Sequence, residues 1–259
     1  MKSRALLGVF LWLWMCMSAA SAAKLDIVST DYPPFNYLEH DKPAGLATDV
    51  LRAMLVHTDL TYTIEFLPWQ RALLRVEKDP NVLIYTLART PGREEQYEWI
   101  GPVAPRRVYF WKLKSRHDLK LDRLSDVRKF RVATVRADAQ TDLMIKLDLL
   151  DPDKLAAVTN GDAAVRMLYA GRVDFIANSE IGMAWRLKFL SLDPAQVERS
   201  MMLVDSGGYY FALGKGADAA LVRKLRRAFD QVKANGQADQ VLMRYMPACP
   251  PGGACKSAR

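Results

Sequence analysis

Two arginines flank a short Thr-Pro-Gly turn that follows an apolar stretch of the chain. Arg89 and Arg93 lie on either side of this turn, directly after residues 82–87. A guanidinium group keeps its charge and offers two parallel N–H donors, which match the two oxygens of a carboxylate. The pair therefore indicates an anion-binding site. A solvated corner, with Arg93 paired to Glu94 or Glu95, fits the same residues and stays open at this point.

Other side chains suited to binding a small molecule follow other apolar runs. Because ligands of open α/β sheets bind beyond the carboxyl ends of the strands, such side chains are expected to line one cleft. Trp69 could instead cap a helix core, Arg71 could cover the helix start, and the helix after Asp138 could present bare N–H groups to an anion. The candidates are Tyr32, Trp69, Arg71, Arg89, Arg93, Asp138, Ser179 and Glu180.

The elements that must position these side chains alternate between strands and helices of about ten residues. This alternation predicts an α/β fold on a mostly parallel sheet. The predicted strands are 25–29, 62–66, 82–87, 108–113, 130–135, 173–177 and 209–213, and the predicted helices are 48–57, 69–78, 140–150, 162–170, 221–235 and 237–245.

The first residues have the pattern of a secretory signal peptide. Lys2 and Arg4 precede an apolar run of 13 residues, 5–17, which is shorter than the roughly 20 residues that a membrane-spanning helix needs. Small residues follow up to Ala23. We predict that residues 1–23 are removed near Ala22 or Ala23 and that the mature protein is exported to the periplasm.

Export affects the interpretation of the cysteines that remain, Cys249 and Cys255, which flank a Pro/Gly-rich turn. In an oxidising compartment this arrangement predicts a disulfide in a C-terminal tail, residues 249–259. A metal site is the weaker alternative, because His40, His57 and His117 are scattered and lack ligand spacing. We expect no metal and no cofactor.

The charge is moderately positive and dispersed. Removal of Lys2 and Arg4 lowers the formal net charge from +8 to +6, and basic residues are interleaved with acidic ones. Nucleic-acid binding would require a basic stripe or a known motif, and the sequence has neither.

About 236 mature residues with two similar sets of strands and helices predict two lobes.

Several motifs, in this order, resemble the family 3 extracellular solute-binding proteins, which are periplasmic receptors of polar amino acid ABC importers. The similarity covers essentially the whole mature chain. It rests on Tyr32-Pro33-Pro34-Phe35-Asn36-Tyr37, on residues 45–50, on Arg89 to Arg93 with Trp99-Ile100-Gly101-Pro102, on Gly171-Arg172-Val173-Asp174, and on residues 210–236.

The resemblance implies a type II periplasmic-binding-protein fold, with two chain crossovers and a ligand cleft between lobes that close by hinge bending. The crossovers are expected near 109–113 and 205–210. Lobe 1 is expected to comprise 24–110 plus 207–248, and lobe 2 to comprise 111–206. The implied partners are a small carboxylate-bearing ligand and an inner-membrane ABC permease, and the protein is expected to be a monomer.

The same resemblance assigns roles to particular residues. An aromatic residue at the Tyr32 position stacks on the ligand, the position of Trp69 lines the cleft, and the arginine at the Arg93 position holds the α-carboxylate. The family's acidic residue for the α-amino group falls on Ser179 here. Either a shifted loop lets Glu180 take the ammonium, or the ligand has no amino group.

A second departure concerns Arg89. The family's Thr or Ser that contacts the carboxylate falls on Ala88 or Arg89, which favours a more anionic ligand or an unusually bound amino acid.

Three hypotheses for function follow. The leading one is capture of a small zwitterionic or anionic solute, an amino acid or a related carboxylate, for ABC import. The second is an exported dehydratase-like enzyme that acts on cyclic carboxylates, with Glu180 as general acid. The third is a solute-binding sensor that is not coupled to transport. The sequence favours a binding protein over an enzyme, because it lacks a Ser/His/Asp set, a reactive cysteine and a metal cluster.

Overall fold

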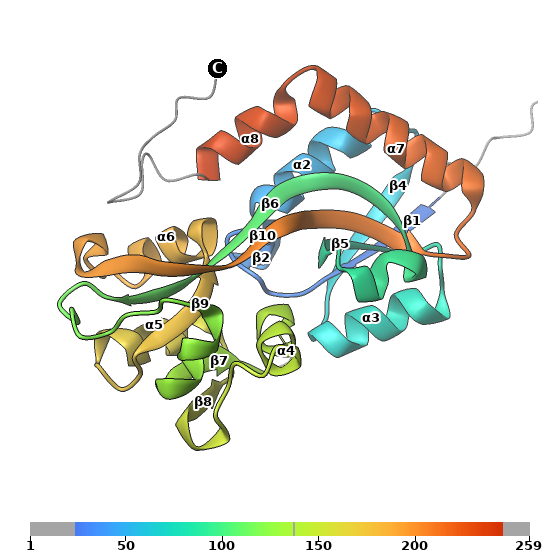
Figure 1. Ribbon diagram of the computed structural model, residues 1–259. Coiled ribbons are helices and arrows are strands. Elements are labelled where there is room, and N and C mark those ends of the chain that lie inside the picture. Colours follow the sequence, from blue (N-terminus) through green and yellow to red (C-terminus); the bar gives the residue numbers. More distant parts are fainter. Residues whose placement is uncertain (1–23, 137, 246–259) are drawn as a thin grey trace, which may run out of the picture.

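The computed structural model describes residues 24–136 and 138–245 and confirms the predicted α/β fold. Alternating runs of β-branched and other apolar residues form strands, and the amphipathic segments between them form helices that cover the sheet (Figure 1). In this part of the chain no helix is both long and apolar enough to cross a membrane. The predicted signal peptide and the Cys249–Cys255 disulfide lie outside the described residues.

The elements agree with the predicted ones at most positions, with shifts of a few residues at their ends. The strands are β1 (Lys24–Ser29), β2 (Tyr37–Glu39), β3 (Lys42–Ala44), β4 (Thr61–Phe66), β5 (Leu83–Ala88), β6 (Tyr97–Leu113), β7 (Val132–Val135), β8 (Leu155–Val158), β9 (Phe175–Ser179) and β10 (Val197–Gly214). The α-helices are α2 (Leu46–Leu55), α3 (Trp69–Lys78), α4 (Ala139–Lys146), α5 (Gly161–Tyr169), α6 (Glu180–Phe189), α7 (Ala219–Ala234) and α8 (Gln237–Tyr245). Short 3-10 helices are η1 (Pro91–Gln96), η2 (Leu124–Lys129), η3 (Pro152–Lys154) and η4 (Pro194–Gln196).

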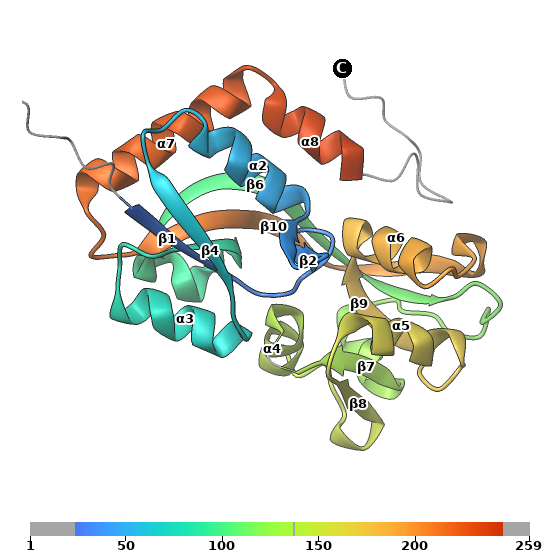
Figure 2. The same cartoon turned by 180° about the vertical axis from the view of Figure 1, so that it is seen from behind.

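One mixed sheet of eight strands runs through the described chain in the order β4-β1-β5-β10-β6-β9-β7-β8. At one end of the sheet β1 pairs in parallel with β4 and β5, and at the other end β7 pairs in parallel with β8 and β9. The long strands β6 and β10 pair antiparallel with each other from Tyr97–Gly214 to Leu113–Val197. The two strands run side by side from one half of the molecule to the other (Figures 1 and 2).

The lobes meet along these two crossing strands. On β10, residues 209–212 pair with β5, whereas on β6, residues 108–111 pair with β9. The chain therefore passes between the halves in the segments between these pairings, and a register irregularity lies between Asp205 and Gly208. The lobe boundaries expected from the sequence stay a proposal, and lobe 1 and lobe 2 are used below in that sense.

Each half has its own core. In lobe 1, α2, α7 and α8 lie on one face of the sheet and α3 on the other (Figure 2). Fully buried side chains such as Phe35, Leu51 and Phe211 fill the first interface, and Ala72 and Val76 of α3 pack in a separate cluster. In lobe 2, clusters around Phe175 and Val165 pack on the sheet between α4, α5 and α6.

Helix α6 was not predicted, and it changes the setting of two candidate residues. Ser179 ends β9 and caps α6, where its hydroxyl accepts a hydrogen bond from the Gly182 N–H at 3.0 Å. Glu180 is consequently the first residue of a helix instead of part of an open loop. The sequence of α6 does not show the apolar periodicity of an amphipathic helix, because apolar residues occur on several sides of it and Gly182 lies within it.

Candidate functional site

A cavity of about 220 Å³ opens between the two lobes at the carboxyl ends of the parallel strands. This volume is far above the roughly 10–15 Å³ that one water molecule needs. Residues of both lobes surround it, as expected for a ligand cleft. The lining residues are Thr30, Asp31, Tyr32, Asn36, Trp69, Thr86, Ala88, Arg93, Val135, Arg136, Asp138, Ala139, Gln140, Thr159 and Tyr209.

Aromatic side chains form the lobe 1 wall of this cleft. Tyr32 lies in the turn after β1, its ring stacks on Phe35 with centroids 5.4 Å apart, and its hydroxyl lies 3.0 Å from that of Tyr209. Burial raises the pKa of Tyr32 and raises that of Tyr209 well above its usual value, so both hydroxyls stay neutral near pH 7. The two hydroxyl groups therefore offer the ligand uncharged hydrogen-bond donors and acceptors.

Arg93 points toward the cleft, whereas its neighbours in the turn do not. The helix η1 folds the chain back, so that the guanidinium carbon of Arg93 lies 5.6 Å from the centre of the Trp69 ring. One Nη donates to the Ala88 carbonyl at 3.5 Å. No ion pair to Arg93 occurs within residues 24–136 and 138–245, and burial lowers its pKa without removing the charge.

Arg89 lies on the other side of the turn and does not line the cleft. Its guanidinium group forms a two-pronged ion pair with Glu94, with Nε 2.8 Å from Oε2, and it stacks over the rings of Trp99 and Tyr210. The acidic partner that the sequence suggested for Arg93 is therefore the partner of Arg89. These contacts are those of a structural ion pair at the surface.

We expect Arg89→Ala to leave ligand affinity unchanged within about twofold, because every contact of Arg89 lies outside the cleft. The loss of a half-exposed ion pair and of two cation–π contacts should lower the free energy of unfolding by about 1–2 kcal/mol. Thermal unfolding and calorimetry on the same variant measure the two effects. An affinity loss of tenfold or more would contradict this prediction and would indicate that Arg89 contacts the ligand.

Three other candidates also lie apart from the cleft lining. Ser179 is buried as the cap of α6, and Glu180 forms an ion pair with Arg199. Arg71 lies exposed on the first turn of α3. In each case local helix geometry, which the sequence did not reveal, directs the side chain to another partner or to solvent.

Asp138 lines the cleft from lobe 2. It caps α4, where one carboxylate oxygen accepts a hydrogen bond from the Gln140 N–H at 3.1 Å. Burial raises the pKa of this carboxyl group, and the nearby charges of Arg106 and Arg186 oppose the shift. The acidic side chain thus occupies the N-terminus of α4, so the N–H groups there are not the bare anion site that was the alternative from the sequence.

Thr86 and Asn36, which were not candidates from the sequence, also line the cleft. Thr86 lies within β5 and has a φ of +63°, a conformation that a β-branched residue rarely adopts. Such strain is held in place by surrounding structure and is typical of functional sites. No feature of the apolar run 82–87 signals it.

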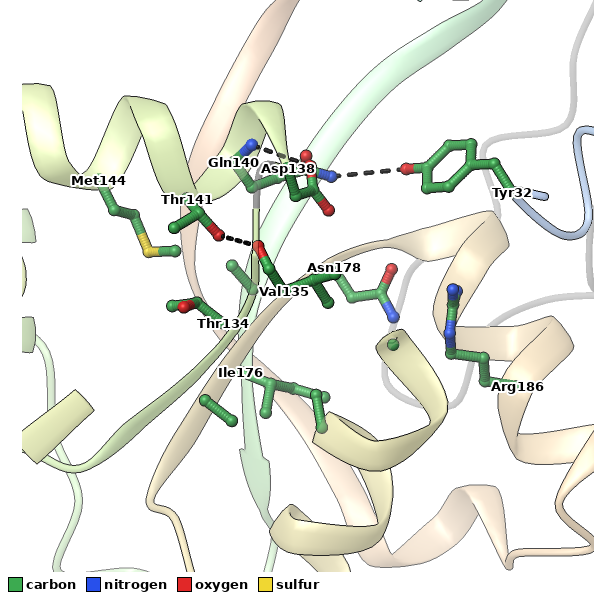
Figure 3. A pocket seen from close by; sticks show the side chains of 14 residues that line it. Tyr32, Thr134, Val135, Asp138, Gln140, Thr141, Met144, Ile176, Asn178 and Arg186 are labelled. Atoms are coloured by element: carbon green, nitrogen blue, oxygen red, sulfur yellow. Dashed lines mark hydrogen bonds between the residues drawn. The ribbon is translucent and has the colours of Figure 1, made fainter. Parts of the chain in front are cut away.

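A second, water-sized cavity of about 30 Å³ continues from the cleft into lobe 2. Tyr32, Val135, Asp138 and Gln140 line both cavities. Figure 3 shows the Tyr32 hydroxyl reaching from lobe 1 to the side-chain amide of Gln140, a contact of 3.5 Å, with Asn178 and Arg186 on the lobe 2 side. The cavity lies beyond the carboxyl ends of β7 and β9.

Unpaired polar atoms gather around these two cavities. In the described chain, five buried side-chain polar atoms lack a hydrogen bond, namely Asn36 Oδ1, Thr86 Oγ1, Arg106 Nε, Thr134 Oγ1 and Arg186 Nε, although Arg186 Nε forms an ion pair with Asp162 Oδ1 at 3.2 Å. All but Arg106 belong to residues that line the cavities. Buried polar groups are nearly always hydrogen-bonded, so this concentration is that expected of a site that binds a polar molecule.

Residues 27–248 match the family of bacterial extracellular solute-binding proteins, family 3. The chain belongs to this family. Among the curated proteins, none matches the sequence. The family match confirms the resemblance drawn from the motifs, and it agrees with the two-lobed fold and the cleft between the lobes.

Solved structures show the same fold at low sequence identity. A histidine kinase sensor domain with similarity to periplasmic binding proteins has a TM-score of 0.75 and 16% identity, and the match covers 88% of this chain and 98% of that one. A structure from work on glutathione import by GshT and the cystine ABC importer TcyBC of Streptococcus mutans has a TM-score of 0.74 and 17% identity, covering 86% and 95%. The ancestral amino acid-binding protein AncCDT-1, a precursor of cyclohexadienyl dehydratase, has a TM-score of 0.71 and 17% identity, covering 86% and 95%.

Within the described residues of this family 3 protein, no group of three or more His, Cys, Asp or Glu side chains is arranged to hold a metal ion. The polar groups of the cleft are instead arginine, carboxylate, amide and hydroxyl groups. These are groups that bind organic ions by hydrogen bonds and charge.

Proposed function

We propose that this family 3 protein captures a small zwitterionic or anionic solute, an amino acid or a related carboxylate, and delivers it to an inner-membrane ABC permease. The observation that carries the proposal is Arg93, a cation in the cleft with no ion-pair partner among the described residues. In the proposal its two parallel donors hold the ligand carboxylate. Tyr32 and Trp69 provide the aromatic surfaces that pack against the rest of the ligand.

The proposal includes closure of the lobes over the ligand. Side chains of the two lobes already touch: the Tyr37 ring lies 5.8 Å from the Trp185 ring, and Gln140 reaches Tyr32. In addition, the crossing segments in β6 and β10 offer only two connections to bend. Such an arrangement suits hinge motion around a bound solute.

Export and processing are parts of the same proposal. The family is described as extracellular, which supports removal of residues 1–23 and a periplasmic location. The mature protein is proposed to be a monomer, with Cys249 and Cys255 joined in its C-terminal tail.

A sensor is the second candidate function, because a histidine kinase sensor domain shares the fold over 88% of the chain. A sensor and a transport receptor need the same pocket. If the liganded protein captures a detergent-solubilised ABC permease, transport is favoured. If the liganded protein instead binds a signalling kinase, the sensor function is favoured.

A dehydratase-like enzyme receives less support from the residues themselves. AncCDT-1 connects this fold to a dehydratase precursor, but the acid proposed for this chemistry, Glu180, is paired with Arg199 and lies outside the cleft lining. Turnover assays with prephenate and arogenate test this alternative.

The proposal is tested by isothermal calorimetry of the purified mature protein against the twenty L-amino acids and a panel of mono- and dicarboxylates. We expect at least one of them to bind with one-site stoichiometry and to raise the melting temperature by mass action. If none of these compounds binds, the proposed function is wrong.

A further inference from the structure

We propose that the ligand carries a second anionic group and that Arg136, on the lobe 2 side of the cleft, binds it. This inference rests on the proposed function and narrows its ligand class to compounds with two anionic groups, such as dicarboxylates and acidic amino acids. Arg136 was not a candidate from the sequence, which favoured a more anionic ligand on account of Arg89.

Arg136 lies at the point where two parallel strands of lobe 2 end. Val135 of β7 is paired with Val158 of β8, and the Arg136 N–H donates to the Val158 carbonyl at 3.1 Å. Thr159 therefore lies next to Arg136, and both residues line the cavity of about 220 Å³. A guanidinium group and a hydroxyl group on neighbouring residues offer the donors that a carboxylate accepts.

Two arginines from opposite lobes thus line one cavity, Arg93 from lobe 1 and Arg136 from lobe 2. Within residues 24–136 and 138–245, neither forms an ion pair with a carboxylate. Two like charges that share a cavity repel each other, and an anion between them offsets this repulsion. Arg93 holds the first carboxylate in the proposed function, so Arg136 is available for a second anionic group. A ligand with both groups would connect the lobes and favour their closure.

Two acids, Asp31 and Asp138, line the same cavity and are the residues that could neutralise Arg136. Neither forms an ion pair with it in the described part of the chain. Desolvation raises the pKa of both carboxyl groups, and the charge of Arg186 opposes the shift at each. A close ion pair with Arg136 would instead lower these pKa values. The charge of Arg136 is therefore left for the ligand.

Among the residues that line the two cavities, positive charge exceeds negative charge. The charged lining residues are Arg93, Arg136, Arg186, Asp31 and Asp138. Near them, the buried Arg106 adds one positive charge, and Asp162, paired with Arg186 at 3.2 Å, adds one negative charge. Asp142 of α4 is exposed, so solvent screens its charge. The cleft therefore favours a ligand whose net charge is negative.

Arg106 strengthens this preference, because its charge is buried. It lies on β6, is only 5% exposed, and its Nε has no hydrogen bond. No ion pair to Arg106 occurs among the residues that the structure describes. Its charge acts on Arg93, Asp138 and Tyr209, which all line the cleft. Because a buried cation without an ion-pair partner is costly, a ligand of net negative charge stabilises this arrangement more than a zwitterion does.

The test compares compounds of nearly the same shape that differ by one negative charge. The pairs are L-glutamate with L-glutamine, L-aspartate with L-asparagine, and succinate with succinamate. By calorimetry, the purified mature wild-type protein should bind the acid of at least one pair roughly 10- to 100-fold more tightly than the amide, the range for a hydrogen bond to a charged group.

Arg136→Gln removes the charge of an exposed side chain and keeps a polar group in its place. It should remove most of the preference for the acid, while the affinity for the amide changes by less than about threefold. Arg172→Gln is the matched control, because Arg172 is also an exposed arginine of lobe 2 but lines neither cavity. It should leave both affinities unchanged.

Three results would overturn the inference and leave the proposed function standing. The first is a wild-type protein that binds amides as tightly as acids, or only compounds with a single carboxylate, a comparison that needs no variant. The second is an unchanged preference in folded Arg136→Gln. The third is an equal loss of affinity for both members of a pair in this variant, which would mean that Arg93 and Arg136 hold the same carboxylate. Failure of every compound to bind would instead reject the proposed function, and the inference with it.

Discussion

Replacement of Arg93 by alanine should weaken ligand binding by about 30- to 5,000-fold, the largest functional effect that we expect from a single substitution. Truncation of one partner of a desolvated, hydrogen-bonded charge pair costs roughly 2–5 kcal/mol, because the other charge is left unpaired. Here the ligand carboxylate would lose the cleft cation that lies over Trp69. Calorimetry with the ligand of the wild-type protein measures the effect.

The same substitution should leave the ligand-free protein as stable as before or more stable. Arg93 is partly buried without an ion pair in residues 24–136 and 138–245, and burial lowers its pKa, so its charge is held at a cost. Loss of the cation–π contact with Trp69 offsets part of the gain. A residue that is unfavourable for folding but required for binding is the pattern expected of a functional site.

Arg93→Lys is the informative control. Lysine keeps the charge but lacks the planar pair of donors, so an affinity loss of about tenfold is expected, between wild type and alanine. Arg89→Ala, four residues away in the same turn, is the control for the loss of one positive charge, and it should leave ligand affinity unchanged. Binding that survives Arg93→Ala unchanged would reject the carboxylate contact.

The sequence predicted most elements because their apolar periodicity is strong. Helix α3 has the predicted bounds, and α7 follows the spacing of Leu225, Phe229 and Val232, which are buried. The long strands β6 and β10 were predicted only in part. Gly101-Pro102 and Gly207-Gly208 are typical of chain breaks, and here they lie within bulged strands whose register is maintained by the partner strand.

The candidate site was predictable in part, because loops that follow the strands hold several cleft residues. Tyr32, Trp69, Arg93 and Asp138, each three to five residues beyond a strand, line the cleft, whereas Arg89 and Glu180, which follow a strand directly, do not. The sequence did not indicate Arg186, because this residue lies on the unpredicted helix α6 and its guanidinium group lies against Gly161 and Gly182. Asn178, near the end of β9, carries no motif that distinguishes it.

The difference between Arg89 and Arg93 shows the limit of spacing arguments. Side chains four residues apart share a face in an α-helix. This segment instead passes from the end of β5 into η1, which sends Arg93 over Trp69 and Arg89 over Trp99. Only the three-dimensional course of the turn decides which arginine is available to a ligand.

The largest stability effect is expected for Gly45→Ala, at the start of α2. Gly45 has φ 112° and ψ 169°, a region that is essentially restricted to glycine, and strain there costs about 1–3 kcal/mol. A Cβ at this position would lie 2.6 Å from the Phe35 carbonyl oxygen and 2.8 Å from that of Pro34. Both contacts are with backbone, so the chain itself must move.

These two carbonyl groups connect the helix to the ligand site. The Leu46 N–H donates to Pro34 at 2.9 Å and the Ala47 N–H to Phe35 at 2.7 Å, which satisfies the first donors of α2. The same turn carries Tyr32 into the cleft. We therefore expect Gly45→Ala to lower the free energy of unfolding by about 3 kcal/mol or more and the melting temperature by roughly 6–12 °C. Ligand affinity should fall as well, because Tyr32 is displaced.

Two other glycines serve as controls that distinguish the two causes of the expected loss of stability, the unusual φ of Gly45 and the close approach of backbone atoms to an added Cβ. Gly171 has a φ of +65° but no atom within 4 Å of an added Cβ, so Gly171→Ala should show the conformational cost alone, about 1 kcal/mol. Gly92 has neither feature, and Gly92→Ala should leave the melting temperature nearly unchanged. Thermal unfolding of the three variants, with calorimetry on those that fold, gives the comparison. If Gly45→Ala destabilises the protein no more than Gly171→Ala does, the close approach between the turn and α2 is not what holds Tyr32 in the cleft.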